Sequence, residues 1–437
     1  MFWTETSTAL STHTSRWKRE KQRERTFDVK GTERLYEKDA YLTRCEATVL
    51  SVRKLTGEEN TESGCSLELI LNKTVFFPEG GGQSSDIGWI CSAGNNGGHR
   101  SGMLAVTDVQ IKDGVIRHTV SCPEDNGELF LPGDHVLLQI NWERRFGFMQ
   151  NHTGEHILSG LMHNRYGFDN IGFHLSDNSV TLDVNGQLSE EEILLLEWEA
   201  NEVIYSNLPV EVSYPDKDKL GEISYRSKIE IEGQVRLVTI PDVDVCACCA
   251  THVRRTGEIG LIKIVKTLRF NGGMRLFIAC GRRAFALMQK RQQRIEEVSH
   301  LTNRSQDEIG DGVKHLLDEI GELKQKNRDL EYKAAFLRLE TIPEDQKNVF
   351  LFVGDMDNIV QRNLVNRLCE EHDGFCGVFA GSDKEGKYRY IIGSRKMDSR
   401  DVQKALREKL GAKGGGKPEM IQGSVTGTES CIAEVLP

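Results

Sequence analysis

The sequence of 437 residues lacks several features that would assign it to a broad class. Nothing in it approaches the roughly 18 consecutive apolar residues of a membrane span, and the N-terminus has no apolar signal core. A net charge of −10 argues against a generic nucleic-acid coat, although a local basic surface can still bind a folded RNA. Eleven cysteines without regular framework spacing are typical of reduced thiols. We therefore expect a soluble, cytoplasmic protein without a membrane partner.

With 38% hydrophobic residues, the chain can bury several cores, and its length predicts about two to four domains. The patterning predicts an α+β multidomain protein. Short β-rich runs between glycine-rich turns predict an N-terminal small β-barrel over residues 31–150, and mixed patterns predict an α+β domain over 151–285. Within that domain, the capping box Ser189-Glu190-Glu191-Glu192 predicts the start of a helix. The patterning further predicts a helical hairpin or coiled coil over 286–340 and a small C-terminal α/β domain over 346–437.

Residues 1–30 are rich in Ser and Thr and then in basic residues, which predicts a disordered basic extension. A transit peptide, an RNA-tethering arm or a mis-assigned start codon are the alternatives.

Residues 286–340 combine a strongly helical composition with heptad spacing. A break near Thr302–Arg304, followed by a capping box at Ser305 and Glu308, predicts two helical arms. The a and d positions of the second arm are Val313, Leu316, Ile320, Leu323, Asn327, Leu330, Ala334 and Leu337. This seam closes either against the first arm or against a second subunit as a homodimer, and the sequence leaves both open.

Two histidine-centred clusters carry ligand chemistry. The run His152-Thr153-Gly154-Glu155-His156 opens an amphipathic stretch, so its two histidines, at i and i+4, share one face of a helix and can hold one ion. The stretch Cys246-Ala247-Cys248-Cys249-Ala250-Thr251-His252 offers a thiolate and an imidazole from a tight turn. Together they supply a tetrahedral set of nitrogen and sulfur that Zn²⁺ prefers. The alternative is that each cluster consists of packed histidines near a buried thiol.

A third motif is the run Pro78-Glu79-Gly80-Gly81-Gly82-Gln83. Three successive glycines let a backbone approach a ligand or another backbone without Cβ clashes. Gly80, Gly81, Gly82 and Gln83 are therefore candidates for substrate binding, although a turn between strands explains the glycines equally well.

The order of these motifs, with Trp142-Glu143-Arg144-Arg145 leading into the histidine pair, resembles the free-standing alanyl-tRNA editing proteins of the AlaX family in its long form. The chain is also similar to the editing half of alanyl-tRNA synthetase. The resemblance covers most of residues 31–437. In its last part, Lys413, Gly414, Gly415, Gly416 and Lys417 look like the glycine-rich signature of a DHHA1-type tRNA-binding domain.

The resemblance implies one zinc ion held by His152, His156, Cys248 and His252. Two departures from the family pattern stand out. Cys249 and Ala250 replace a pair of glycines, which would strain the turn if either position needed a positive φ. Glu155 stands where relatives often carry Gln or Thr, and it is the candidate catalytic residue.

The implied reaction is hydrolysis of the ester that joins serine, or glycine, to the terminal adenosine of alanine tRNA. An alanine-sized activation pocket cannot fully reject either amino acid, so a second site must select by different contacts. His174, Ser176 and Thr181 lie in the stretch that lines the family's pocket and are candidates for binding the serine hydroxyl.

Other interpretations remain open. His152-x-x-Glu155-His156 also matches an inverted zinc-peptidase pattern with Glu155 as general base, but such peptidases take a carboxylate as their third ligand. Cys246-x-x-Cys249 matches a redox pair without a thioredoxin-like context. A non-catalytic tRNA-binding factor with structural zinc is the other alternative. Zinc could activate water, polarise the ester or only position the substrate.

We also expect the adenylate-forming domain of a synthetase to be absent, because only residues 1–30 precede the expected barrel. The protein would then correct mischarged tRNA in trans.

Overall fold

The computed structural model describes residues 31–55, 65–93, 103–122, 130–227 and 233–437. The extension expected for residues 1–30 lies outside these described residues. The chain divides into two compact units, residues 1–293 and 294–437, and each is described by itself. Among the described residues, no helix is long and apolar enough to cross a membrane.

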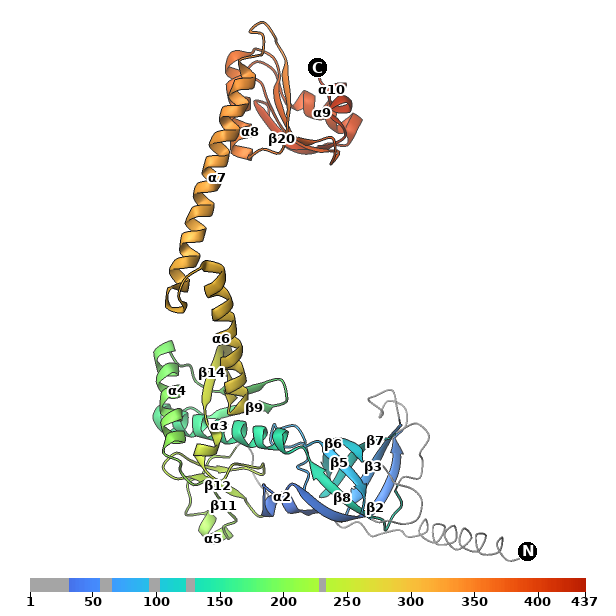
Figure 1. The fold of residues 1–437 in the computed structure, drawn as a ribbon, viewed down its shortest axis with the longest axis vertical. Coiled ribbons are helices and arrows are strands. Elements are labelled where there is room, and N and C mark those ends of the chain that lie inside the picture. The colour runs from blue at the N-terminus through green and yellow to red at the C-terminus, as the bar shows by residue number, and fades with distance from the viewer. Residues whose placement is uncertain (1–30, 56–64, 94–102, 123–129, 228–232) are drawn as a thin grey trace, which may run out of the picture. The chain divides into compact units, whose positions relative to one another are not determined.

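The first unit begins with a closed six-stranded barrel, as the sequence predicts (Figure 1). Its strands follow one another around the barrel in the order β2 (Arg44–Leu55), β3 (Cys65–Leu71), β7 (Val115–Cys122), β6 (Leu104–Lys112), β5 (Gly88–Ser92) and β8 (His135–Ile140). All its neighbouring strands are antiparallel. Alternate side chains such as Val49, Leu69 and Leu138 fill the interior, as the two-residue period of a strand requires. Two short elements, β1 (Glu33–Arg34), which pairs with β4 (Lys73–Thr74), and α2 (Leu35–Lys38), precede the barrel strands.

Helix α3 (Trp142–Tyr166) follows β8 directly and runs away from the barrel (Figure 1). Asn141 caps its first turn by accepting a hydrogen bond from the Arg144 N–H, and Gly167 ends it with a φ of 68°. The helix therefore begins ten residues before the histidine pair, whereas the sequence suggested that the pair opens the amphipathic stretch. Its middle, Phe148–Gly160, is buried on every side, so no apolar stripe marks where it starts.

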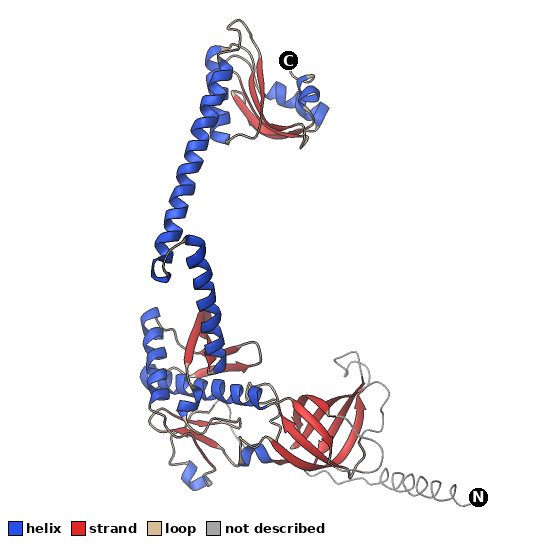
Figure 2. Cartoon of the chain, in the orientation of Figure 1, coloured by secondary structure: helices blue, strands red, loops and turns tan. Residues whose placement is uncertain are grey.

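Two sheets surround this helix (Figure 2). The larger is antiparallel and has the order β14 (Ile262–Phe270), β15 (Gly273–Cys280), β10 (Val180–Val184), β9 (Asn170–Leu175). The smaller has the order β11 (Glu211–Ser213), β12 (Leu237–Ile240), β13 (Asp244–Ala247). Helix α4 (Glu190–Tyr205) begins with the capping box that the sequence predicts, because Ser189 and Glu192 bond each other's backbone N–H.

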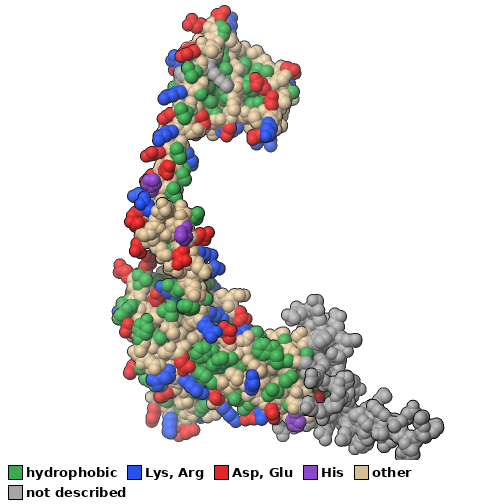
Figure 3. Space-filling model, in the orientation of Figure 1, with side chains coloured by type: hydrophobic (Ala, Val, Ile, Leu, Met, Phe, Trp, Pro, Cys, Tyr) green, Lys and Arg blue, Asp and Glu red, His purple; other side chains and the backbone are tan. Residues whose placement is uncertain are grey.

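Helices α6 (Arg282–Thr302) and α7 (Ile309–Leu339) confirm the helical character of residues 286–340, and Asn303 separates them with a φ of 50°. The expected capping box at Ser305 does not form, because its hydroxyl donates to the Glu308 carboxylate and caps no backbone N–H. The apolar seam residues of α7 are exposed, from 41% at Val313 to 66% at Leu337. Figure 3 shows hydrophobic side chains among charged ones along the helical part of the chain. Pairing of this seam in a homodimer stays a prediction.

The C-terminal domain is one five-stranded mixed sheet with the order β16 (Val349–Val353), β17 (Cys376–Ser382), β18 (Lys387–Gly393), β20 (Met420–Thr426), β19 (Lys413–Lys417). Only β16 and β17 pair in parallel. Helix α8 (Asn358–Glu371) packs on β17 and β18, and α9 (Arg400–Leu410) packs on β19 and β20. The glycine-rich run is therefore an edge strand, which the sequence pattern did not predict.

Candidate metal centre

The three histidines of the sequence motifs meet in the buried centre of the first unit. His152 and His156 lie one turn apart on α3, and His252 follows the turn after β13. The Nδ1–H of His152 donates to Gln83 Oε1 at 2.8 Å, and that of His156 donates to Asp244 Oδ2 at 2.8 Å. His252 Nδ1 lies 3.2 Å from Thr153 Oγ1, whose own proton goes to the carbonyl of Met149. Each Nδ1 is thus occupied, which leaves each Nε2 as the free ligand atom.

These nitrogens converge on the thiol of Cys248. Its Sγ lies 3.6 Å from His152 Nε2 and 3.4 Å from His252 Nε2, and the four ligand atoms all lie within 4.8 Å of one another. Atoms bound to one zinc at about 2.0–2.3 Å in a tetrahedron lie roughly 3.5 Å apart. The donor set and spacing therefore fit zinc, and the structure brings together the four ligands expected from the sequence.

The electrostatics hold Cys248 and His252 in the protonation states that a metal would bind, whereas His156 would have to release a proton to bind it. Burial alone would raise the pKa of Cys248, but the surrounding imidazoles of His152 and His252 outweigh it and hold the pKa well below its usual value. Burial lowers the pKa of His252 to about 3, so its imidazole is neutral near pH 7. Burial opposes a charge on His156, but hydrogen bonds to Asp244 and Cys248 raise its pKa well above the ordinary value. A thiolate among imidazoles is the state that a cation would bind.

The glycine-rich turn supplies the partner of His152. Gly81 and Gly82 have φ values of 61° and 79°, and a Cβ on Gly82 would overlap the carbonyl of Phe173. This close approach lets the turn pair with β9, because Leu175 N–H donates to the Gly82 carbonyl at 2.7 Å. Gln83 follows and is fully buried. The turn is thus part of the metal centre, although contact between Gly80–Gln83 and a substrate stays a prediction.

A buried ion pair fixes that turn to α3. Arg145 and Asp86 are 0% and 1% exposed, and the guanidinium donates to both carboxylate oxygens and to the carbonyl of Val75. Asp86 also accepts from the Phe77 N–H at 2.7 Å. Arg145 lies on α3 two helical turns before His152, and Asp86 lies three residues after Gln83. The ion pair therefore fixes the glycine-rich turn against α3, where Gln83 can reach His152.

Glu155 is buried beside the metal group and does not face solvent. Its Oε1 accepts from Ser159 Oγ at 2.6 Å and from the Asn170 amide, and its Oε2 lies 3.9 Å from His156 Nε2. The third and fourth candidate ligands are a thiol and an imidazole, not a carboxylate, which disfavours the peptidase pattern.

The two departures from the family pattern are accommodated. Neither Cys249 nor Ala250 has a positive φ, so the turn carries no backbone strain there. Ala250 is buried in the apolar core of the barrel, where its methyl group packs. Cys246 belongs to a second group with His156 and Asp244 that could hold a metal. That group shares His156 through its Nδ1, and Asp244 is already bound by Arg226 at 2.7 Å, so we interpret Asp244 as an outer partner of the first group.

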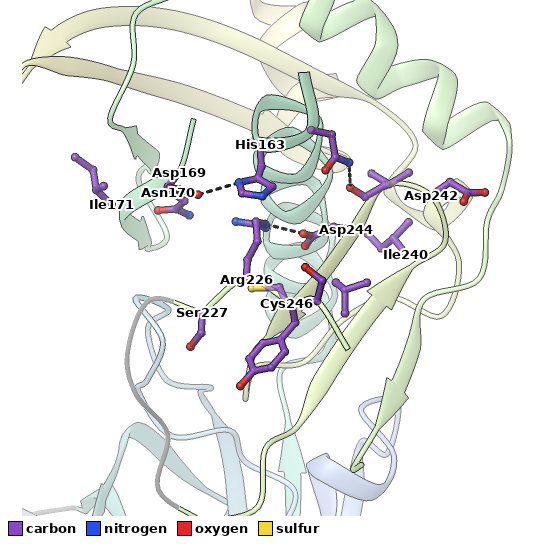
Figure 4. Close-up of a pocket in the computed structure, with 15 residues that line it drawn as sticks. His163, Asp169, Asn170, Ile171, Arg226, Ser227, Ile240, Asp242, Asp244 and Cys246 are labelled. Carbon is purple, nitrogen blue, oxygen red and sulfur yellow. Dashed lines mark hydrogen bonds and ion pairs between the residues drawn. The ribbon is translucent and has the colours of Figure 1, made fainter. Parts of the chain in front are cut away.

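Asp244, the partner of His156, lines a cavity of about 890 Å³ (Figure 4). It lies between the end of α3 and strands β12 and β13, and Figure 4 shows the Arg226–Asp244 pair and the His163–Asp169 pair on its wall. Asn170, the partner of Glu155, also lines it. Sequence reasoning missed Asp244, Arg226 and Asn170. Only the position of Asp244, four residues before Cys248, could have suggested it.

The other candidate residues lie on β9 and β10. His174 pairs with Thr181 across the two strands, while Phe173 contacts the ring of His152 at 4.8 Å between centroids. Because side chains alternate along a strand, His174 and Thr181 point to the opposite face of the sheet from Phe173. The structure therefore does not bring these two to the metal group. Ser176 Oγ contacts the Ser179 carbonyl in the turn, and a substrate role for all three stays a prediction.

Sequence comparisons agree with this architecture. Residues 3–144 match the family of class II (A) tRNA synthetases. Residues 235–277, which include Cys248 and His252, match the second additional domain of threonyl and alanyl tRNA synthetases, and residues 345–436 match the DHHA1 domain.

Individual relatives cover almost the whole chain. The alanyl-tRNA editing protein AlaX-L of Pyrococcus horikoshii is 28% identical over 92% of this chain and 97% of its own length. The alanine–tRNA ligases of Pyrobaculum calidifontis and Pyrococcus furiosus are 31% and 29% identical over 96% and 92% of this chain. The chain spans only 46% and 43% of these ligases. The C-Ala domain of Aquifex aeolicus alanyl-tRNA synthetase, 22% identical over 20% of this chain and 89% of its own, gives a TM-score of 0.18, which is too low to support an argument.

Proposed function

Because its resemblance to the alanyl-tRNA editing proteins is confirmed along most of the chain, we propose that this protein is an aminoacyl-tRNA deacylase that hydrolyses mischarged alanine tRNA. The observation that carries the proposal is the buried convergence of His152, His156, Cys248 and His252. The substrate bond is the ester between a serine or glycine and the terminal adenosine.

These four residues would hold one zinc ion, which would supply Lewis acidity toward the ester carbonyl or toward water. Gln83, Asp244 and Thr153 keep each imidazole in the tautomer that presents Nε2. Glu155 Oε2 lies 3.9 Å from His156 Nε2, and Ser159 and Asn170 fix the orientation of its carboxylate. It is the candidate for a general base, but we expect it to shape the site without transferring the proton, and the Glu155→Gln variant decides between these two roles.

Selection of serine over alanine requires polar contacts, whereas glycine, which only lacks the methyl group of alanine, has to be selected by size. A buried group that bonds the serine hydroxyl would stay unpaired when alanine is bound. The free-energy cost of that unpaired group is larger than the binding free energy contributed by one methylene group. Gln83 Nε2 is such a group, because it is buried and has no hydrogen-bond partner among the described residues. Gln83 also bonds His152, so it is a stronger candidate for reading the aminoacyl side chain than His174 and Thr181, which point to the face of the sheet opposite Phe173. A role for Ser176 stays a prediction.

The C-terminal domain would supply affinity for tRNA. Lys413 and Lys417 are exposed at the two ends of β19, where they can neutralise phosphates, and the glycines between them allow close approach. Removal of residues after 345 should weaken tRNA binding while leaving hydrolysis at saturating enzyme largely intact.

The test is deacylation of serine-, glycine- and alanine-charged alanine tRNA by the purified chain. We expect hydrolysis of the serine or glycine ester and none of the correct alanine ester. Cys248→Ala should lose both zinc and activity, while the adjacent exposed Cys249→Ala, which lies outside the ligand set, should keep both.

Full activity and full zinc content in Cys248→Ala would contradict the site. If the parent hydrolyses no ester and chelation of zinc unfolds the chain, the metal is structural and the protein is a non-catalytic tRNA-binding factor.

A further inference from the structure

Helix α4 presents an apolar face that stays exposed in the described part of the chain. Leu194, Trp198 and Tyr205 are 65%, 62% and 72% exposed. They lie four and then seven residues apart, so they share one side of the helix. The opposite side packs into the core of the first unit through Leu196 and Ala200. A stripe of large exposed apolar side chains indicates a surface that binds another protein.

The flanks of this face are acidic. Helix α4 contains no lysine or arginine, and Glu190, Glu191 and Glu202 are exposed and form no ion pair among the described residues. Because each residue turns about 100° around the helix axis, Glu190 lies on one side of the stripe and the other two glutamates lie on the opposite side. A second α4 would be repelled by these carboxylates, whereas an apolar and basic helix fits them.

Helix α6 has this complementary character. Phe285 and Met288 are 62% and 44% exposed and lie one turn apart. Arg282 and Arg291 lie on the two sides of this pair. Arg291 forms no ion pair among the described residues, and Arg282 pairs with the exposed Glu143. The first unit therefore carries both an acidic apolar face on α4 and a basic apolar face on α6.

A two-fold axis between two copies would cover both faces at once. In such a pair, α4 of each copy packs on α6 of the other, so one contact occurs twice and the assembly is closed. Apolar side chains would lie at the centre of each contact, and carboxylates would meet guanidinium groups at its rim, as in stable protein interfaces. Trp198 lies in the middle of the stripe, and tryptophan is among the residues that most often dominate binding energy.

We propose that α4 is the docking surface for α6 of a second copy of this chain. Leu194, Trp198 and Tyr205 pack against Phe285 and Met288 of the other copy. This surface is distinct from the apolar seam of α7, and the proposal does not depend on the proposed function.

The first experiment is sedimentation velocity of the full chain over a dilution series at several salt concentrations. We expect a monomer–dimer equilibrium that weakens as salt rises, because the charged rim is screened. Trp198→Ala should raise the dissociation constant at least about tenfold. Leu268→Ala is the matched control, since Leu268 is an exposed apolar residue of β14 outside both faces, and it should dimerise like the parent. Thermal unfolding verifies that every variant is folded.

The second experiment exchanges charges between the two helices. Glu191→Arg and Arg291→Glu should each dimerise more weakly than the parent, because each variant alone places like charges across both contacts. An equimolar mixture of the two variants should dimerise again, since every α4 then meets an α6 of opposite charge. Glu211→Arg changes an exposed glutamate of β11 by the same charge and should leave the equilibrium unchanged.

Three outcomes would overturn the proposal. One is a parent chain that stays monomeric at every concentration. Another is a dimer that Trp198→Ala leaves intact while Leu323→Ser dissociates it, which would assign the contact to the seam of α7. The third is a mixture of Glu191→Arg and Arg291→Glu that dimerises no better than either variant alone, which would show that α4 and α6 do not meet.

Discussion

Replacing Asp244 by asparagine tests whether the outer partners of the metal centre fix its histidines. Asp244 is buried, and its two carboxylate oxygens each serve a different donor: Oδ2 accepts from His156 Nδ1 and Oδ1 accepts from Arg226 Nε at 2.7 Å. Asparagine keeps the shape but has only one acceptor oxygen. Either His156 or Arg226 would then face an amide NH₂ and lose its acceptor.

Losing the outer partner of a ligating histidine typically weakens metal binding about 10–100-fold, which equals about 1.4–2.7 kcal/mol. We expect Asp244→Asn to lie in this range when zinc affinity is measured by competition with a chromophoric chelator at neutral pH. The deacylation rate of the Asp244→Asn variant should be closer to that of the parent at saturating zinc than at limiting zinc, because the four candidate ligands themselves are intact.

Asp242→Asn is the matched control. Asp242 lines the same cavity two residues away, is exposed, and has a φ of 61°, a conformation that asparagine also tolerates. Its zinc affinity should equal that of the parent. If Asp244→Asn binds zinc as tightly as Asp242→Asn, the carboxylate does not orient His156 and the interpretation of the centre is wrong.

Three further substitutions test other parts of the structure. Glu155→Gln keeps an acceptor for Ser159, so serine-tRNA deacylation should stay within about tenfold of the parent, or about 1.4 kcal/mol; a total loss with unchanged zinc would make Glu155 catalytic. Gly82→Ala should lower the free energy of unfolding by at least about 1–3 kcal/mol, because its φ is 79° and the methyl group overlaps Phe173, whereas Gly80→Ala has room and should unfold like the parent in urea. Burial lowers the pKa of His118 to about 4, so the unfolded chain takes up this proton at a higher pH than the folded chain. Stability should therefore fall by up to about 3 kcal/mol as the pH drops from about 6.5 to 4, and an equal fall in His118→Gln would rule out this source.

Local signals in the sequence predicted the elements that depend on neighbours along the chain. The capping box at Ser189 formed because its two hydrogen bonds join residues three apart. The four candidate ligands could be proposed for the same reason, since His152 and His156 are separated by one helical turn and Cys248 and His252 by one tight turn, and the structure brings the four together. A similar signal at Ser305 was wrong, because there the two side chains bond each other.

The start of α3 and the strands β19 and β20 were not predictable from pattern. A helix buried on all sides shows no apolar stripe, so the histidines appeared to begin it. Three glycines have a low strand propensity, and β19 forms because β20 offers it a complete antiparallel ladder.

By itself, the sequence determined the nature of the candidate ligands: two helical histidines, a thiol and a third imidazole, followed by a separate domain with a glycine–lysine run. Only the tertiary structure decided which groups support them. Gln83 and Asp244 lie 69 and 88 residues from the histidines that they orient, and Asp86 lies 59 residues from Arg145. Such pairs carry no periodic signal, because the chain brings them together only when the barrel, α3 and β13 pack around one buried centre.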